Sequence, residues 1–155
     1  MDHEQVRVAL AQCEFFQGLT PQDIERVVAL CEVKRLEAGE FVFEQGDFGE
    51  DLFVIVDGQL FLDHHFNLGD RQANVTIASL GRGRVLGCWS TMLDEAHILM
   101  CSAVCAKPSL VVRLSGSQLR RLMVENKEFG FIMLQRLALL LRDRVRLAYG
   151  ALEKF

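Results

Sequence analysis

The chain has 155 residues and a formal net charge of −4, from 17 Lys and Arg against 21 Asp and Glu. Half of the residues are hydrophobic and a quarter are charged, which is typical of a globular domain with a real core. The acidic balance argues against direct nucleic-acid binding, because such surfaces need clustered Lys and Arg. The chain contains no run of about eighteen apolar residues and no signal peptide, so we expect no membrane span and a cytoplasmic protein.

The five cysteines are an odd number without a CxxC pair, which argues against a secreted disulfide framework. We interpret them as small reduced thiols. His97, Cys101 and Cys105 follow each other at intervals of four, but this segment is predicted to contain a strand, in which four residues span roughly 13 Å. Ligands of one zinc ion cannot lie that far apart, so no metal site is predicted.

Residues 1–36 are predicted to form two helices. The first covers about 2–14, where polar and apolar residues alternate at helical spacing. The second begins at Thr20-Pro21 with Asp23 at the third helical position: a hydroxyl cap, a proline in the first turn and a carboxylate near the helix N-terminus.

Residues 37–115 are predicted to be β-rich. Glycines recur at short intervals and separate short runs of β-forming residues. Many short strands with frequent turn signals predict a jelly-roll-like β-roll. The expected strand runs are 41–43, 52–56, 59–62, 73–78 and 103–114. His64 and His65 are expected at a solvated hairpin tip.

Residues 116–155 return to helical spacing. Ser117 is predicted to cap a helix that ends near Asn126, and a long helix follows. Its apolar residues repeat at alternating intervals of three and four, which is typical of a helix that packs along another helix. The residues of this seam are Phe131, Leu134, Ala138, Leu141, Val145, Ala148, Leu152 and Phe155.

A second apolar stripe lies beside the seam and consists of Met133, Leu137, Leu140 and Leu147. Two stripes indicate two partners, the helix's own domain and a second copy of the chain. The alternative is one wide stripe that packs on the β-layer. Beyond Arg142 little chain remains to cover the seam, so a homodimer is predicted through Leu134, Ala138, Leu141, Val145, Ala148 and Leu152. Arg142, Arg144 and Arg146 are expected to point outward.

The predicted fold is therefore α+β: one domain, residues 1–155, in which N-terminal helices and a long C-terminal dimerisation helix flank a β-roll. This order resembles the cyclic-nucleotide-binding domain of Crp-type regulators, kinase regulatory subunits and gated channels. The stretches that carry the resemblance are FFQGLTPQDIERV, LEAGEFVFEQGDFGEDLFVIVDGQLFL, LGRGRVLG and AVCA. The third resembles the turn into the family's phosphate-binding cassette, here residues 83–106, with Gly83 and Gly87 at the family's glycines.

The resemblance implies a regulatory, signal-transduction domain. The sequence has no GxSxG, HExxH, GxxxxGK(S/T) or paired-carboxylate motif, so we expect no enzyme. In the family, backbone N–H groups and an arginine match the charge of the cyclic phosphate, and a glutamate binds the ribose 2′-hydroxyl. Here the glutamate position is Cys88. The arginine position is Met100 when counted back from the following strand, or His97 when counted forward from Gly87.

No residue from 85 to 106 is Arg or Lys, and Asp94 and Glu95 add negative charge. Loss of a buried charge-assisted hydrogen bond costs about 1.5–3 kcal/mol. We therefore expect weak or absent binding of cyclic AMP and cyclic GMP in the usual mode. The candidate ligand-binding residues are Gly87, Cys88, Trp89, Ser90, Thr91, Met100, Cys101 and Ser102.

The favoured interpretation is a homodimeric sensor module that responds to a small-molecule effector or a partner, with no certain cofactor. One alternative is genuine cyclic-nucleotide binding through backbone amides and the hydroxyls of Ser90 and Thr91, in the effector half of a Crp-type transcription regulator. A second is a structural dimerisation scaffold whose pocket is filled by Trp89 or Met100. A third is a redox switch at Cys88. No haem-ligand position matches well enough to carry over.

Overall fold

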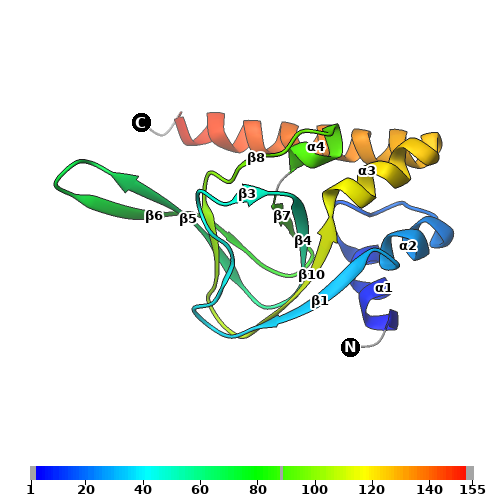
Figure 1. Ribbon diagram of the computed structural model, residues 1–155, viewed down its shortest axis with the longest axis horizontal. Coiled ribbons are helices and arrows are strands. Elements are labelled where there is room, and N and C mark those ends of the chain that lie inside the picture. Colours follow the sequence, from blue (N-terminus) through cyan, green and yellow to red (C-terminus); the bar gives the residue numbers. More distant parts are fainter. Residues whose placement is uncertain (1–2, 88, 153–155) are drawn as a thin grey trace.

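The computed structural model describes residues 3–87 and 89–152, with the backbone alone for residues 147, 148, 151 and 152. It has the predicted α+β architecture, in which strands form a roll, short helices close one end, and a long helix runs across the top (Figure 1). Ala148 and Leu152 of the predicted seam lie outside the described side chains, and Phe155 and Cys88 lie outside the described residues.

The N-terminal helices are α1 (His3–Gln12) and α2 (Pro21–Val28). The predicted start of α2 is confirmed, because the backbone N–H of Asp23 donates to the Thr20 hydroxyl at 3.2 Å. Asp23 also accepts a hydrogen bond from Arg26 at 3.0 Å. Both contacts fix the first turn of α2, whose inner face then packs into the core.

Within the described residues, two four-stranded antiparallel sheets, ordered β1-β10-β4-β7 and β2-β9-β5-β6, form the roll beside the two-stranded pair β3-β8. The strands are β1 (Cys31–Leu36), β2 (Phe41–Phe43), β3 (Phe48–Gly49), β4 (Asp51–Asp57), β5 (Leu60–Asn67), β6 (Gln72–Leu80), β7 (Val85–Gly87), β8 (His97–Ile98), β9 (Ser102–Cys105) and β10 (Ser109–Ser115).

Two predictions about the strands are wrong. The run 103–114 is interrupted, because residues 106–108 form bends and Pro108 has no N–H to donate to a ladder. His64 and His65 lie inside β5 and not at the hairpin tip. The His64 ring Nδ1 lies 2.6 Å from the Met100 carbonyl oxygen, which holds this part of the strand. The tip falls at residues 68–71 instead.

The C-terminal helices are α3 (Gly116–Glu125) and α4 (Lys127–Leu152). The cap of α3 is Ser115 and not the predicted Ser117, because β10 runs directly into the helix and the Ser115 hydroxyl accepts from the Gln118 N–H at 3.4 Å. The predicted end of α3 at Asn126 is confirmed.

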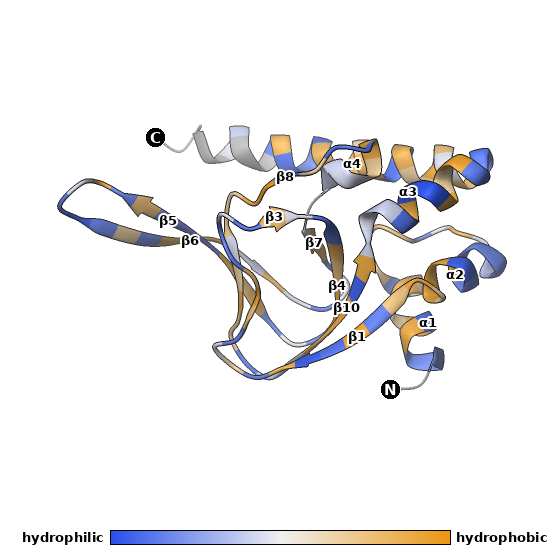
Figure 2. Cartoon of the chain, viewed as in Figure 1, coloured by the Kyte–Doolittle hydropathy of each residue, from blue (hydrophilic) through white to orange (hydrophobic). Residues whose placement is uncertain are grey.

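The buried side chains form two clusters. One joins all four α-helices to a face of β4 and β10, and the other fills the inside of the roll. On α4, Met133 and Leu137 are buried in the first cluster, whereas Leu134 and Val145 are exposed. Figure 2 shows the resulting alternation of hydrophobic and hydrophilic segments along α4. In the part of the chain that the structure describes, no helix is both long and apolar enough to cross a membrane.

Candidate functional site

The cassette begins where β7 ends in a glycine turn. Gly87 has φ +115° and lies opposite Leu52 of β4. A Cβ at this position would overlap the Asp51 carbonyl oxygen and lie 3.2 Å from the Leu52 Cα. Only glycine accepts both the positive φ and the close approach of the neighbouring strand. This explains why the turn into the cassette carries the glycine on which the sequence resemblance depends.

A short 3-10 helix, η1 (Trp89–Leu93), follows and packs on α3. Met92 and Thr91 are buried there, and the Arg120 guanidinium donates to the Met92 carbonyl oxygen at 2.8 Å. A Cβ on Gly116 would overlap the Thr91 hydroxyl. The cassette is therefore in tight contact with the first turns of α3.

A cavity of about 500 Å³ lies between the roll, η1 and α4. Its lining is largely apolar and consists of Phe43, Leu62, Ile77, Ala78, Leu80, Val85, Leu86, Gly87, Trp89, His97, Leu99, Met100, Cys101, Leu141 and Arg144. Strands from the two four-stranded sheets supply one wall, and α4 supplies part of the other. The geometry brings the cassette and the long helix to the same space.

The cavity contains some of the predicted ligand-binding residues and not others. Gly87, Trp89, Met100 and Cys101 line it. The remaining described candidates are not lining residues: Thr91 contacts α3, the Ser102 hydroxyl accepts from the Gln45 N–H at 2.8 Å, and the Ser90 hydroxyl is hydrogen-bonded to the ring of His97, which does line the cavity. Cys88 lies outside the described residues.

The prediction that Arg144 points outward is wrong. This residue of α4 lines the cavity, with its guanidinium carbon 6.0 Å from the centre of the Trp89 ring. Its Nη2 lies 3.8 Å from the Glu14 carboxylate. Burial, and next the positive charge of Arg84, lower the pKa of Arg144. In the sequence, Arg144 follows Leu141 by three residues and so shares its helical face, but this spacing does not say what that face contacts.

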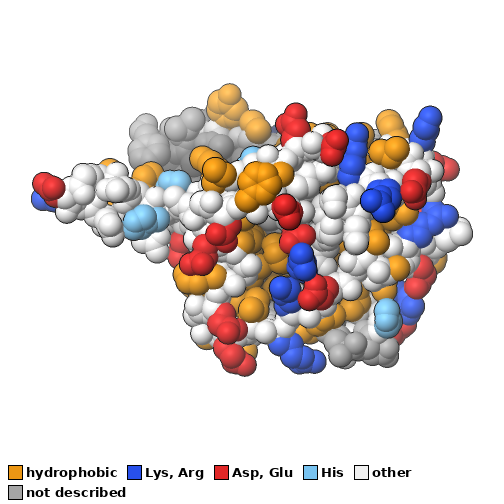
Figure 3. Space-filling model, viewed as in Figure 1, with side chains coloured by type: hydrophobic (Ala, Val, Ile, Leu, Met, Phe, Trp, Pro, Cys, Tyr) orange, Lys and Arg blue, Asp and Glu red, His pale blue; other side chains and the backbone are white. Residues whose placement is uncertain are grey.

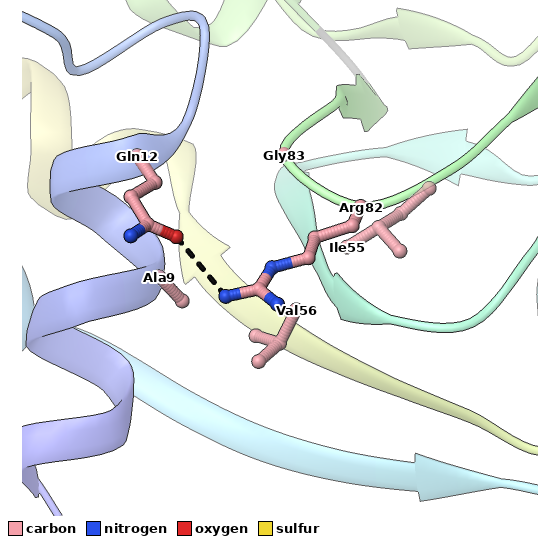
Figure 4. A pocket seen from close by; sticks show the side chains of 6 residues that line it. All are labelled: Ala9, Gln12, Ile55, Val56, Arg82 and Gly83. Atoms are coloured by element: carbon pink, nitrogen blue, oxygen red, sulfur yellow. Dashed lines mark hydrogen bonds between the residues drawn. The ribbon is translucent and has the colours of Figure 1, made fainter.

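A separate cavity of about 250 Å³ lies between α1 and the β4 strand (Figure 4). The Arg82 and Gln12 side chains point toward each other, and the Arg82 guanidinium donates to the Gln12 amide oxygen at 3.0 Å. The remaining lining is Ala9, Ile55, Val56 and Gly83. With its one cation already bound to Gln12, this cavity is a weaker candidate for a ligand than the cavity beneath the cassette.

The described cysteines are protected by burial. Burial raises the pKa of Cys13 to about 11 and that of Cys31 to about 12. The thiol pKa values of Cys101 and Cys105 are also raised, first by burial. These thiols are less reactive than an exposed one. Within residues 3–87 and 89–152, no group of three or more His, Cys, Asp and Glu side chains is placed to hold a metal ion.

Comparison with known proteins gives consistent matches. The cyclic AMP receptor protein of Thermus thermophilus is 32% identical over 84 residues, which is 53% of this chain and 36% of that protein. A cyclic nucleotide-binding domain from Methylobacillus flagellatus has a similar fold, with a TM-score of 0.81 at 21% identity over 99% of this chain and 84% of that chain. The catabolite activator protein of Thermus thermophilus has a TM-score of 0.74 at 27% identity over 90% of this chain and 62% of that one.

The model of the cyclic nucleotide-binding domain matches residues 33–126. This range begins in β1 and ends after α3, so it includes the roll, the glycine turn at Gly87 and the whole cassette. It covers more than half of the chain. The chain therefore belongs to the cyclic nucleotide-binding domain family.

Proposed function

We propose that this chain is a homodimeric regulatory module that does not bind cyclic AMP or cyclic GMP in the usual mode. The observation that carries the proposal is the absence of any Arg or Lys between residues 85 and 106. A cyclic phosphate that enters the cavity would meet apolar side chains along the cassette. A phosphate held in the usual place, against the cassette, would therefore have no cation of the cassette to match its charge, which is costly.

The contact between η1 and α3 supports a regulatory role. Thr91 abuts Gly116, and Gly130 of α4 lies so close to Met123 of α3 that a Cβ there would overlap the Met123 carbonyl oxygen. A ligand that shifts η1 would therefore push on α3, and α3 on α4. A two-state rearrangement of these helices would carry the signal.

The two faces of α4 support self-association. The stripe that contains Met133 and Leu137 is buried in the chain's own core, whereas Leu134 and Val145 remain 41% and 52% exposed. Leu141, of the same stripe as Leu134 and Val145, is 45% exposed and also lines the cavity. Figure 3 shows hydrophobic side chains on both the upper and the lower half of one face, while most Lys and Arg lie on its right-hand half. Covering the exposed stripe with a second α4 would remove apolar surface from water.

Sedimentation of matched variants tests the dimer. Leu134→Asp places a charge in the seam, whereas Val8→Asp places the same charge on α1, where the exposed fraction is also 41%. We expect a dimer for the wild type and for Val8→Asp, and a monomer for Leu134→Asp. A monomeric wild type at micromolar concentration would contradict the dimer.

Calorimetry with cyclic AMP, cyclic GMP and cyclic dinucleotides tests the ligand proposal. We expect no binding of cyclic AMP or cyclic GMP tighter than about millimolar by the wild type. Met100→Arg and His97→Arg each restore a cation in one of the two cassette registers, and the correct one should raise affinity by one to two decades. Stoichiometric micromolar binding of cyclic AMP by the wild type would overturn the proposal.

Genuine cyclic-nucleotide binding is the second candidate. It is supported by the open cavity, by the family's name, and by a similar fold in the regulatory domain of Toxoplasma gondii PKA, solved with cAMP. That structure is 19% identical, with a TM-score of 0.62, over 77% of this chain and 43% of that one. The same open cavity disfavours the scaffold alternative, because Trp89 and Met100 line the space without filling it.

A further inference from the structure

The side chains that line the cavity beneath the cassette restrict which ligands fit it, because most of the ligand's surface would contact them. Arg144 is the one Lys, Arg, Asp or Glu among its lining residues, and most of the others are aliphatic or aromatic. The sugar hydroxyls and base nitrogens of a nucleotide would find few partners among them. Buried polar groups without partners are unfavourable, whereas apolar groups gain from leaving water. The lining therefore favours an apolar body.

One end of the cavity is different, because Arg144 also lines an adjoining cavity of about 440 Å³. The other residues of this second cavity are Glu14, Arg84, Leu140, Asp143 and Arg146. Arg144 thus stands where an apolar space meets a polar one. A molecule in the larger cavity can reach its guanidinium with one end.

The guanidinium of Arg144 shares its counter-ion, the Glu14 carboxylate, with Arg84. Its ion-pair partner is the Glu14 carboxylate, which lies 3.8 Å from the Arg144 Nη2. The same carboxylate lies 3.1 Å from Arg84 Nε and accepts a hydrogen bond from the Val85 N–H at 3.3 Å. One carboxylate therefore serves two guanidinium groups. Asp143, also beside this cavity, is hydrogen-bonded to Arg142 at 3.1–3.2 Å. The positive charge at the junction exceeds the negative charge that faces it.

Trp89 completes the junction. Its ring lies edge-on to Phe15, with centroids 6.0 Å apart, and beside the Arg144 guanidinium. A fixed indole next to a cation suits a molecule that has an aromatic or aliphatic body and one acid group. Such an acid could pair with Arg144 in two parallel hydrogen bonds.

We infer that the cavity binds an amphipathic organic monoanion, with its apolar body among the strands of the roll and its single acid group on Arg144, where it displaces Glu14. The inference rests on the proposed function and names the ligand class of that same site. The anion is held by α4 and not by the cassette. Binding would therefore tie the long helix directly to the roll.

Two dyes with the same ring system test the inference. Anilinonaphthalene sulfonate carries one sulfonate, and N-phenylnaphthylamine is its neutral counterpart. Their affinities would be measured by fluorescence titration on the wild type, on Arg144→Met, and on Arg121→Met, which removes an exposed cation of α3 that lines neither cavity. Ala78→Phe fills part of the cavity and reports whether the dyes bind inside it.

We expect the sulfonate dye to bind the wild type, with about 10- to 100-fold weaker binding to Arg144→Met. The neutral dye should bind both proteins equally, Arg121→Met should match the wild type for both dyes, and Ala78→Phe should weaken both. Equal loss of both dyes, or no loss, in Arg144→Met would overturn the inference, as would full sulfonate-dye binding by a folded Ala78→Phe.

A parallel titration with cyclic AMP separates this inference from the proposed function. Tight cyclic AMP binding by both the wild type and Arg144→Met would contradict the proposed function. The dye titrations would still decide whether Arg144 binds the acid group. If cyclic AMP binds weakly and the affinity of the sulfonate dye is the same for the wild type and Arg144→Met, the proposed function stands and the monoanion inference is overturned.

Discussion

The two walls of the cavity differ in what each contributes. The wall formed by the roll and the cassette is shaped by backbone constraints, such as the close approach of Gly87 to β4, and it carries no Arg or Lys between residues 85 and 106. The wall formed by α4 contributes Leu141 and the cation Arg144. The comparison teaches that the shape of a binding site and its charge can be set by different elements. Substitutions in one wall that leave the other wall unchanged test whether shape and charge are set separately.

The largest effect is expected at the glycine turn of the cassette wall. Gly87→Ala would combine a strained φ of +115° with overlap of the Asp51 carbonyl oxygen. Strain and overpacking each cost about 1–3 kcal/mol, so we expect a loss of roughly 2–6 kcal/mol in the free energy of unfolding. Urea denaturation measures this loss.

Gly39→Ala is the matched control for that change. Gly39 also has a positive φ, of +86°, but a Cβ there would have no neighbour within 4 Å. Its cost should therefore stay near that of the backbone strain alone, about 1 kcal/mol. Equal losses for the two variants would show that the approach of β4 does not constrain the cassette wall.

The next effect separates the two faces of the helical wall. Met133 is fully buried against the core, whereas its neighbour Leu134 is 41% exposed. Met133→Ala should lower the free energy of unfolding by about 2–5 kcal/mol at any protein concentration. Leu134→Ala should cost less than about 1 kcal/mol in the monomer. Denaturation at several protein concentrations checks both, and a large, concentration-independent loss in Leu134→Ala would contradict the assignment of the faces.

Sequence reasoning predicted most of the elements that carry local signals. The start of α2 was readable because Thr20 and Pro21 act within one turn, and the glycine turns were readable because positive φ selects glycine. The cap of α3 was misplaced by two residues. Ser115 and Ser117 both carry a hydroxyl, and only the end of β10 decides which one becomes the cap.

The candidate site was less predictable, because it joins segments that are far apart in the chain. The cassette residues could be named from their place after Gly87, but their neighbours could not. Arg144 was assigned to a solvated face, since its helical position alone does not say that the roll lies beneath it. A charged residue at the border of an apolar stripe is ambiguous until the tertiary partner is known.

A smaller effect than those of Gly87→Ala and Met133→Ala is expected at the contact that joins the cassette to the helices. Arg120 donates to the Met92 carbonyl oxygen at the end of η1, so Arg120→Ala should cost about 1–2 kcal/mol through the lost hydrogen bond. The neighbouring Arg121 is exposed, and Arg121→Ala should stay within about 0.5 kcal/mol of the wild type.

Hydrogen exchange locates the consequence of Arg120→Ala. If η1 is held against α3 by this contact, its amides should exchange faster in the variant, while those of β4 and β10 should change only as far as global stability changes. Uniformly faster exchange over the whole chain would instead show that Arg120 stabilises the fold without linking the two walls. The two walls would then respond to a ligand independently, and the proposed route from cassette to α4 would need another contact.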